Sequence, residues 1–372
     1  MKIRNIEIGT IEIPLLTPFR TALRTVDLLE GIIVRVVTES GMVGYGETAP
    51  TEAITGDSKH GIITALEILS ACMIGESIGN QERLLTIIHQ TVEKNFSAKS
   101  AMEIALYDLW AQAEGLPLYR YLGGEADRFH TGITISLNPV ETMVADALKA
   151  VKNGFESLKI KLGEAPAEDI GRVEAIAAAV GKQIGLKLDA NQGWSPKETV
   201  AFLAELEQRE LRVQLIEQPV RRADFEGLKY IKERSTIPVL ADESAFSPED
   251  ARALLARQAV DMINIKLDKC GGISKALEIA DICREYDTVC MIGCMLEGAI
   301  SVGAAAHMAS ARAETVILYD LDAPILCGDS PVRGGAYFGG AEIHLSEKPG
   351  LGIECVDGVE WHRKISTKKR VR

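Results

Sequence analysis

The sequence predicts an α/β protein built around a modified (β/α)8-type barrel, TIM-like with (β/α)7β connectivity, together with an α+β capping domain. Short apolar strands alternate with stretches of helical character, as in closed parallel barrels. These strands begin near residues 131, 157, 185, 214, 238, 261, 289 and 315. Charged residues end five of them, in the segments IKLG, KLDANQGW, LIEQPV, LADES and NIKLDKCGG. The five segments recur about every 23 to 30 residues, the length of one βα unit in a barrel of about 250 residues.

The barrel is predicted to occupy residues 126–324, after a capping region of different pattern over residues 1–125. Residues 2–16 alternate apolar and polar side chains like a half-buried strand, and residues 31–47 read as two strands joined by a turn. Three helical stretches follow. The first 125 residues are therefore expected to be α+β.

The last of these helical stretches runs from Ser97 to Glu114, with Ser97 as the expected N-cap. Its apolar face is predicted to carry Ala101, Ile104, Ala105 and Leu109. After Asp322 the alternation of strands and helices weakens, and residues 325–372 hold turns with strand-like pieces between them. We expect this C-terminal segment to return to the capping domain.

Composition excludes several classes of partner. The chain has 372 residues and a net charge of −12, which argues against nucleic acid because its phosphates would be repelled. No apolar run approaches the roughly 18 residues of a membrane helix, and the N-terminus lacks the apolar core of a signal peptide. Seven cysteines in a large chain indicate a reduced, cytoplasmic protein. Cys290 and Cys294 are expected to pack in the core, and the basic run 363–372 is expected to be a solvated tail.

Three carboxylates end neighbouring strands of the predicted barrel. Asp189 ends the third strand, Glu217 the fourth and Asp242 the fifth, and active-site groups of such barrels lie at these strand ends. Hard oxygen ligands suit Mg²⁺, one ion per subunit, with Mn²⁺ as a substitute. Taken singly, such an Asp often caps the next helix and Glu-Gln-Pro is a turn. Taken together, in this order and spacing, they predict a metal site.

Lysines flank the predicted metal site. Lys159 and Lys161 are two residues apart on the second strand, so both point inward, and Lys266 ends the sixth strand. Strands two and six face each other in a ring of eight, which is the arrangement that a racemase or epimerase needs. A neighbouring ammonium group and a metal are expected to lower the lysine pKa towards working pH. A lone Lys-x-Lys on a strand is otherwise typical of a solvated edge.

These motifs resemble the enolase superfamily, specifically its muconate lactonizing enzyme subgroup, over the whole chain. The matching segments are the Lys-x-Lys at 159–161, DANQGW at 189–194, EQP at 217–219, ADES at 241–244 and NIKLDKCGG at 264–272. Members of that superfamily use a Lys base together with Mg²⁺. The resemblance implies that Asp189, Glu217 and Asp242 bind the metal and that Lys161 and Lys266 are the acid/base pair. Lys159 would assist the enolate, and Asn191 and Glu243 would support the metal ligands.

Within the subgroup, the substrate is implied by two further features, the D-x-D pair and Arg24. Asp320 and Asp322 form a D-x-D at the end of the eighth strand, which in dipeptide epimerases binds the substrate ammonium group; two turn-capping Asp residues are the alternative. Arg24, in the loop FRTALRTV, would pair with a substrate carboxylate, or would simply be a solubilising loop residue. Glu297, in GCMLEG on the seventh strand, is expected to line the site.

The resemblance therefore implies a dipeptide epimerase that performs 1,1-proton transfer at the α-carbon of the C-terminal residue. L-Ala-D/L-Glu, a peptidoglycan fragment, is the expected substrate, and a homo-oligomer without nucleic-acid or membrane partners is the expected form. The alternatives are an N-succinylamino acid racemase or o-succinylbenzoate synthase, whose substrates lack the ammonium group that the D-x-D suits. A sugar-acid dehydratase would need a late His base, and His307 is expected to pack in the core. A non-catalytic metal-binding scaffold would not need both lysines.

Overall fold

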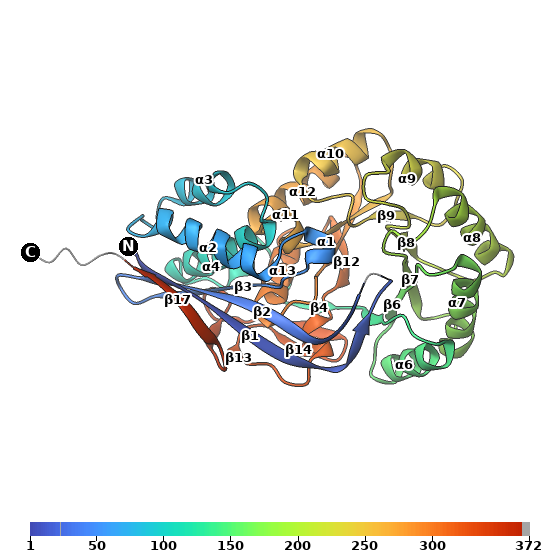
Figure 1. Cartoon of the computed structure of the whole chain (residues 1–372), viewed down its shortest axis with the longest axis horizontal. Coiled ribbons are helices and arrows are strands. Elements are labelled where there is room, and N and C mark those ends of the chain that lie inside the picture. Colours follow the sequence, from blue (N-terminus) through green and yellow to red (C-terminus); the bar gives the residue numbers. More distant parts are fainter. Residues whose placement is uncertain (23, 367–372) are drawn as a thin grey trace, which may run out of the picture.

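Eight parallel strands form the nearly closed barrel of the chain. The computed structural model describes residues 1–22 and 24–366 (Figure 1). The strand order runs from β12 back to β5 without interruption, and Gly132 N–H donates to the Tyr319 carbonyl at 2.9 Å across the remaining gap. Every strand starts within two residues of its predicted position, so the predicted barrel is confirmed. The strands are β5 (Ile133–Ile135), β6 (Ser157–Lys161), β7 (Gly185–Asp189), β8 (Leu215–Glu217), β9 (Val239–Ala241), β10 (Met262–Ile265), β11 (Val289–Gly293) and β12 (Val316–Asp320).

Helices connect these strands, as parallel strands require. Two of them, α8 and α10, begin with a Ser capping box followed by Pro in the first turn, which explains why they start where they do. In the described part of the chain, β12 is followed by no α-helix but only by the short 3₁₀ turn η1 (Ala323–Leu326) and further strands, which confirms the (β/α)7β pattern. The helices are α6 (Val140–Lys152), α7 (Pro166–Val180), α8 (Pro196–Gln208), α9 (Phe225–Lys232), α10 (Pro248–Ala256), α11 (Leu267–Cys270), α12 (Ile273–Glu285) and α13 (Ala299–Ser310).

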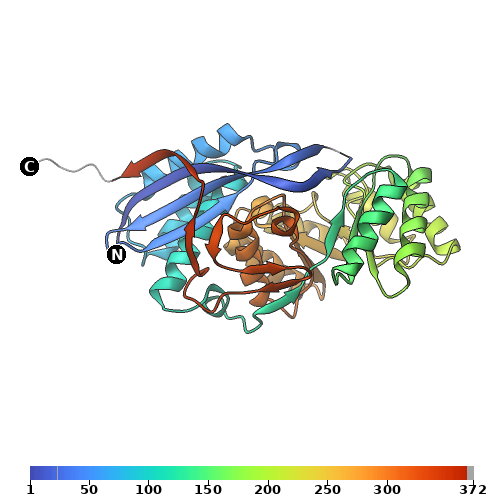
Figure 2. The same cartoon turned by 90° about the horizontal axis from the view of Figure 1, so that it is seen from below.

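The cap combines an antiparallel sheet of order β17-β1-β2-β3 with helices on one face. Its N-terminal elements are β1 (Ile3–Arg20), β2 (Thr25–Thr38), β3 (Val43–Thr48), α1 (Glu52–Thr55), α2 (Lys59–Met73), α3 (Gln81–Thr91), α4 (Phe96–Ala113) and α5 (Leu118–Tyr121). β1 and β2 are longer than predicted because they pair as far as Arg20 and Thr25. Figure 2 shows this hairpin reaching from the cap towards the barrel, where Leu137 N–H donates to the Arg20 carbonyl at 3.0 Å.

Helix α4 differs from its prediction in two respects. Ser97 is not the N-cap: the helix begins at Phe96, and the Ser97 amide and hydroxyl both donate to Asp57. The helix is also buried nearly all round rather than on one face. It lies between β3 and the barrel helix α11, and it approaches β3 so closely that a Cβ at Gly46 would collide with the Ala101 carbonyl.

The C-terminal segment returns to the cap, as expected. The segment forms β13 (Val332–Gly334), β14 (Tyr337–Gly339), β15 (Glu342–His344), β16 (Ile353–Val356) and β17 (Glu360–Ser366), and β14 and β15 join β4 (Arg128–His130). Because β17 pairs antiparallel with β1, the start of the basic run is a strand with exposed side chains and not a tail. Residues 367–372 lie outside the described residues. The domain limits at residues 125 and 324 stay a prediction.

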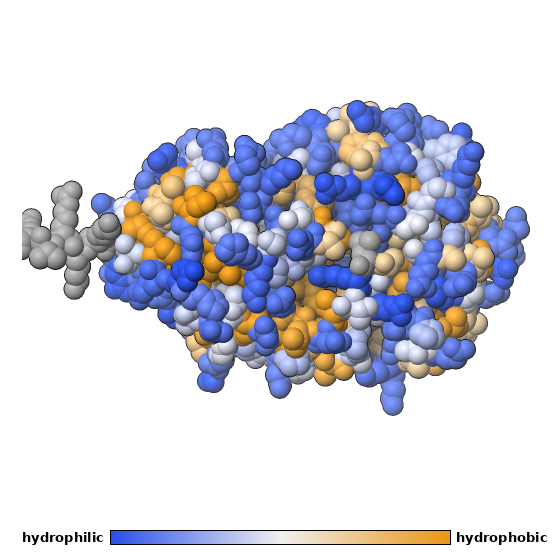
Figure 3. Space-filling view, in the orientation of Figure 1, coloured by the Kyte–Doolittle hydropathy of each residue, from blue (hydrophilic) through white to orange (hydrophobic). Residues whose placement is uncertain are grey.

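The surface over the barrel helices is largely hydrophilic, and apolar side chains gather over part of the cap (Figure 3). Within residues 1–22 and 24–366, no helix combines the length and the apolar character needed to cross a membrane. The core is formed by the inner face of the cap sheet and by the layers between the barrel and its helices. The fold thus places the C-terminal ends of the barrel strands beneath the cap.

Candidate active site

A cleft lies at the C-terminal ends of the barrel strands. The cap closes it with the tip of the β1–β2 hairpin and with α1, through Phe19, Thr21, Arg24, Thr51, Ala53 and Ile54. Of the predicted site residues, the structure places Arg24, Lys159, Lys161, Asn191, Asp242, Lys266, Asp320 and Asp322 on the cleft wall. Asp189 and Glu217 are fully buried directly beneath it. The structure therefore brings together groups that lie as much as 298 positions apart in the sequence.

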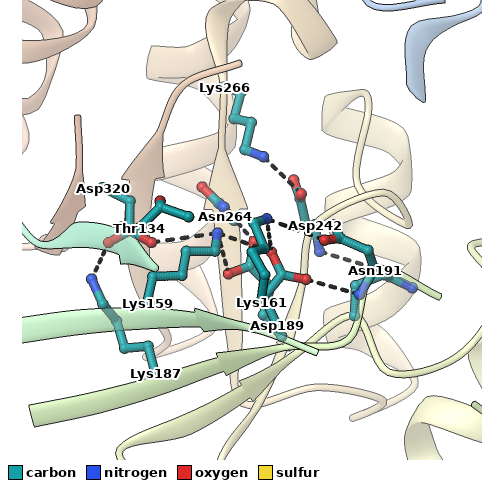
Figure 4. A network of polar contacts seen from close by, with 12 residues as sticks. Thr134, Lys159, Lys161, Lys187, Asp189, Asn191, Asp242, Asn264, Lys266 and Asp320 are labelled. Carbon is teal, nitrogen blue, oxygen red and sulfur yellow. Dashed lines mark hydrogen bonds and ion pairs between the residues drawn. The ribbon is translucent and has the colours of Figure 1, made fainter. Parts of the chain in front are cut away.

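Lys159 is the centre of the buried charges (Figure 4). Its Nζ lies 2.6 Å from Oε2 of Glu217, 3.2 Å from Oδ2 of Asp189 and 3.4 Å from Oδ2 of Asp320. Asp189 and Glu217 are paired in register on adjacent strands β7 and β8, which explains how one ammonium group reaches both. Lys159 thus bridges two of the three predicted metal ligands.

The two predicted bases stand on opposite sides of the barrel mouth. Lys161 ends β6, and its Nζ donates to Asp189 at 2.6 Å and to the Asn191 side-chain oxygen at 3.1 Å. Lys266 follows β10, four strands further round, and donates to Asp242 at 2.7 Å. Each lysine therefore contacts a different carboxylate, and both line the same cleft.

Two lysines of this network were not among the predicted site residues. Lys269, fully buried on α11, lies 2.7 Å from Asp242 Oδ1. Lys187, on β7, forms a very short ion pair with Asp320. The signal for Lys187 was its spacing of two residues from Asp189, which directs both side chains into the barrel. Lys269 had no such signal, because its direction depends on the short helix α11.

The D-x-D pair is divided between two environments. Asp320 is held by Lys159 and Lys187, which lower the pKa of its carboxyl despite its burial. Asp322 instead accepts a hydrogen bond from Thr134 N–H at 2.6 Å, and burial together with Asp320 raises the pKa of Asp322. Asp322 is therefore the member of the pair with no lysine partner among the described residues.

The lysine pKa values differ from the expectation. Although burial alone would lower the pKa of Lys159, the Glu217 and Asp189 carboxylates raise it well above its usual value. At Lys266, burial alone would likewise lower the pKa, but the Asp242 carboxylate raises it above its usual value. The carboxylate partners outweigh the neighbouring ammonium groups because they are closer. Both lysines are therefore held in the charged form in this arrangement.

Two other predictions are corrected by the structure. Glu297 does not line the cleft: its carboxylate turns back to accept hydrogen bonds from Met295 N–H and the Ser301 hydroxyl. Cys294 lines the cleft rather than the core, and its Sγ lies 3.3 Å from the Asp320 carbonyl. By contrast, Cys290 and His307 are buried as expected.

The residues around Asp242 fit a divalent ion in their chemistry. Among the described residues, no three His, Cys, Asp or Glu side chains are placed to hold an ion between them, since lysine ammonium groups lie at the carboxylates instead. However, the buried oxygens Oε2 of Glu217 and Oδ1 of Asp242 accept no hydrogen bond from the described residues, and each forms an ion pair with a lysine. Asn191 Nδ2 donates to Glu243 at 3.4 Å, beside the carboxylates. An all-oxygen set of this kind suits Mg²⁺.

Two family models match the chain: the mandelate racemase/muconate lactonizing enzyme N-terminal domain over residues 5–123, and the enolase C-terminal domain-like family over residues 142–359. The chain belongs to this family of the enolase superfamily, as its motifs predicted, and it is an isomerase.

Several of its similar proteins are named epimerases. It is 44% identical to the L-Ala-D/L-Glu epimerase of Clostridium acetobutylicum, over 96% of this chain and 100% of that protein. It is 41% identical to the hydrophobic dipeptide epimerase of Enterococcus faecalis, over 95% and 99%. A substrate-liganded L-Ala-D/L-Glu epimerase from Bacillus subtilis superposes with a TM-score of 0.94 at 44% identity, covering 96% of this chain and 99% of that one. The Enterococcus faecalis enzyme complexed with Mg and L-Leu-L-Tyr gives 0.92 at 41% identity, over 95% and 100%.

Proposed function

We propose that the chain is a Mg²⁺-dependent dipeptide epimerase acting on L-Ala-D/L-Glu. The observation that carries the proposal is the placement of Lys161 and Lys266 on opposite sides of one cleft. A carbon held between them can lose a proton on one face and gain one on the other. The similar proteins named as dipeptide epimerases support the same reaction.

Asp189, Glu217 and Asp242 would hold the metal. When bound, Mg²⁺ would supply positive charge at the substrate carboxylate next to the reacting carbon. The carboxylates that it would occupy are those that now raise the lysine pKa values, so sharing them with a divalent ion would favour neutral lysines. Mn²⁺ as a substitute remains a prediction.

The lysines would divide the proton transfer between them. By resemblance to the family, a neutral Lys161 would remove the α-proton of the L epimer, and a protonated Lys266, which serves the D epimer, would return a proton to the opposite face. In the reverse direction their roles exchange, because each step must run backwards through the same groups. Lys159, between Asp189 and Glu217, would stabilise negative charge that develops on the substrate.

Asp322 and Arg24 would orient the dipeptide. Asp322 lines the cleft and has no lysine partner within residues 1–22 and 24–366, so its carboxylate is available to the substrate ammonium group. Arg24 lines the cleft from the cap, where burial lowers the pKa of its guanidinium, and it pairs with no carboxylate among the described residues. An acidic side chain on the second residue would provide one.

A second dipeptide class is favoured by a specific observation. Phe19, Ile54, Met295, Leu296 and Leu326 make much of the cleft wall apolar, and a similar protein is named a hydrophobic dipeptide epimerase. An N-succinylamino acid racemase remains the alternative outside the dipeptides, since the N-succinyl-L-Arg/Lys racemase of Bacillus cereus is 31% identical over 95% of this chain. Its substrate would bring no α-ammonium group for Asp322.

The test is a library of dipeptides and N-succinylamino acids incubated in D₂O and followed by mass spectrometry. Each turnover exchanges the α-proton, so substrates gain one mass unit. We expect L-Ala-L-Glu and L-Ala-D-Glu to exchange fastest. Faster exchange of N-succinylamino acids would replace the proposal with the racemase alternative. All seven cysteines are free thiols, which supports cytoplasmic location; a homo-oligomer remains a prediction.

A further inference from the structure

Asp268 is a buried side chain that joins the barrel to the cap behind the cleft. It lies on α11, two residues after Lys266, and it is fully buried. Its Oδ2 accepts hydrogen bonds from the Thr48 hydroxyl at 2.7 Å and from Ala49 N–H at 3.2 Å. Both donors belong to the cap. This one side chain therefore bonds α11 to the cap.

The opposite side of α11 is bonded to the barrel. The ammonium groups of Lys266 and Lys269 each lie 2.7 Å from a carboxylate oxygen of Asp242, and Lys269 also donates to the Asn264 carbonyl at 2.9 Å. α11 has only four residues, and a helix so short does not hold its conformation by itself. The direction of Lys266 therefore depends on the contacts on both sides of α11.

The cap segment that Asp268 holds continues into the loop over the cleft. Thr48 ends β3, Ala49 follows it, and Thr51, two residues further on, already lines the cleft together with Ile54. A shift at Ala49 would therefore be passed to the loop that covers the substrate. Asp268 thus lies on the short helix that follows Lys266, and it bonds the residues that lead into a wall of the cleft.

Glu47 adds a second bond between the same strand and the barrel. Its Oε2 accepts from Ile300 N–H at 3.0 Å and Ser301 N–H at 3.2 Å, in the first turn of α13. Neighbouring residues of a strand point to opposite sides, so Glu47 and Thr48 contact different barrel helices. The end of β3 is consequently bonded to two barrel helices. Of these two contacts, only that of Thr48 with Asp268 reaches α11, the helix that follows Lys266.

We propose that Asp268 is a positioning residue that keeps Lys266 in register with the cap loop over the substrate. The inference rests on the proposed function, because it takes Lys266 as one of two opposed bases. A displacement of about 1 Å at a reacting group costs roughly 100-fold in rate. Lys161 stands across the barrel mouth on β6, so a change at Asp268 affects one face of the α-carbon and not the other.

The experiment measures α-proton exchange in D₂O separately from each epimer of L-Ala-Glu. Asp268→Leu removes the acceptor of both hydrogen bonds. It should slow exchange from the epimer that Lys266 deprotonates, the D epimer, by at least about tenfold, and exchange from the L epimer by less than about threefold. Burial raises the pKa of Asp268 well above its usual range, so neutral Asn is its closest substitute and Asp268→Asn should restore most of the loss.

Two further variants distinguish a misplaced Lys266 from a general loss of stability. Thr48→Val removes one donor without altering α11, and it should reproduce the asymmetry more weakly; it also carries the test if Asp268→Leu does not fold. Asp108→Asn is the matched control, since Asp108 is equally buried and accepts from Tyr45 N–H at 3.0 Å and Leu351 N–H at 2.8 Å without touching α11. It should lower the melting temperature and slow both epimers alike.

The outcomes distinguish the inference from the function on which it rests. Equal slowing of both epimers in Asp268→Leu and Thr48→Val, as in Asp108→Asn, would overturn the positioning role and leave the epimerase assignment standing. No exchange of any dipeptide by the unmodified chain would overturn the proposed function and the inference with it.

Discussion

The Nζ atom of Lys159 lies 2.6 Å from Oε2 of Glu217, and both side chains are almost completely buried. A buried ion pair of this kind loses hydration on both sides, and removing one partner leaves an unpaired charge. The pair therefore links Glu217, a predicted metal ligand, to Lys159, a predicted catalytic lysine. Lys161 and Asp189 form a similar ion pair, and so do Lys266 and Asp242. Binding of a cation at the carboxylates should therefore weaken the ion pairs of all three lysines.

Metal removal should abolish activity. EDTA is expected to stop exchange and Mg²⁺ to restore it, because the clustered carboxylates would hold the ion. Mg²⁺ at 100 times its dissociation constant should also stabilise the fold by about 2.7 kcal/mol, measured as a rise in melting temperature, and Asp242→Asn should remove that rise. Full exchange in a metal-free preparation would contradict the metal-dependent mechanism.

Replacing the lysines singly should separate the two faces of the α-carbon. Lys161→Met should abolish epimerisation and leave exchange of the D epimer, whereas Lys266→Met should leave exchange of the L epimer, as read by mass spectrometry in D₂O. Lys232→Met, on the outside of the barrel beside Asp261, is the control and should exchange both. If both active-site variants exchange the same epimer, the opposed-base arrangement is wrong.

Arg24→Leu should erase the preference for an acidic second residue. A charge-assisted hydrogen bond of roughly 1.5–3 kcal/mol corresponds to about a 10- to 100-fold advantage of L-Ala-L-Glu over L-Ala-L-Leu in kcat/KM. Mg²⁺-induced stabilisation should persist in the variant. Arg20→Leu is the matched control, since Arg20 pairs with Glu164 at 3.4 Å on the surface. An unchanged preference in Arg24→Leu would assign the acidic side chain to another group.

Asp322→Asn should weaken binding of the substrate ammonium group. We expect KM for every free dipeptide to rise by roughly tenfold or more, which corresponds to loss of one charged hydrogen bond. KM for N-acetylated dipeptides should stay the same, because they carry no cation. Asp322 is a cleaner target than Asp320, which also holds Lys159 and Lys187. A parallel rise for both substrate series would exclude the ammonium contact.

Stability should fall as the pH rises from about 4.5 to about 7. Burial raises the pKa of Glu47 to about 7 from the ordinary 4.5. Above pH 4.5 the unfolded chain loses this proton while the folded chain keeps it until about pH 7, so the stability present at low pH is lost across that interval. The loss from this one group is about 3 kcal/mol, at about 1.4 kcal/mol per pH unit.

Glu47→Gln should flatten this part of the profile when urea unfolding is followed from pH 4.5 to 8. The exposed Glu12→Gln serves as the control and should leave the slope as it is. Asp108, whose pKa burial raises to about 6, should account for part of the remaining slope. An unaltered slope in Glu47→Gln would show that this carboxyl ionises normally in the folded protein.

Much of the site could be predicted because active-site residues of a parallel barrel lie at the C-terminal end of the strand in each βα unit. Asp189, Glu217 and Lys266 each follow a short apolar strand, and strand ends of a barrel meet at one mouth. Glu297 follows a strand equally well, yet its side chain turns back to Ser301. The direction of a side chain within a βα loop depends on hydrogen bonds that spacing does not encode.

The sequence by itself determined the eight strand positions, the carboxylates and lysines at their ends, and the membership of the enolase superfamily, since all of these follow from local pattern and motif. Only the tertiary structure decided which charges meet. Lys187 pairs with Asp320, Asp322 accepts a hydrogen bond from Thr134 N–H, and Asp268 accepts one from Thr48. Each of these contacts joins segments that are distant in the sequence. Such contacts arise when the barrel closes and the cap docks, because only then are these polar groups buried together, where an unpaired one is costly.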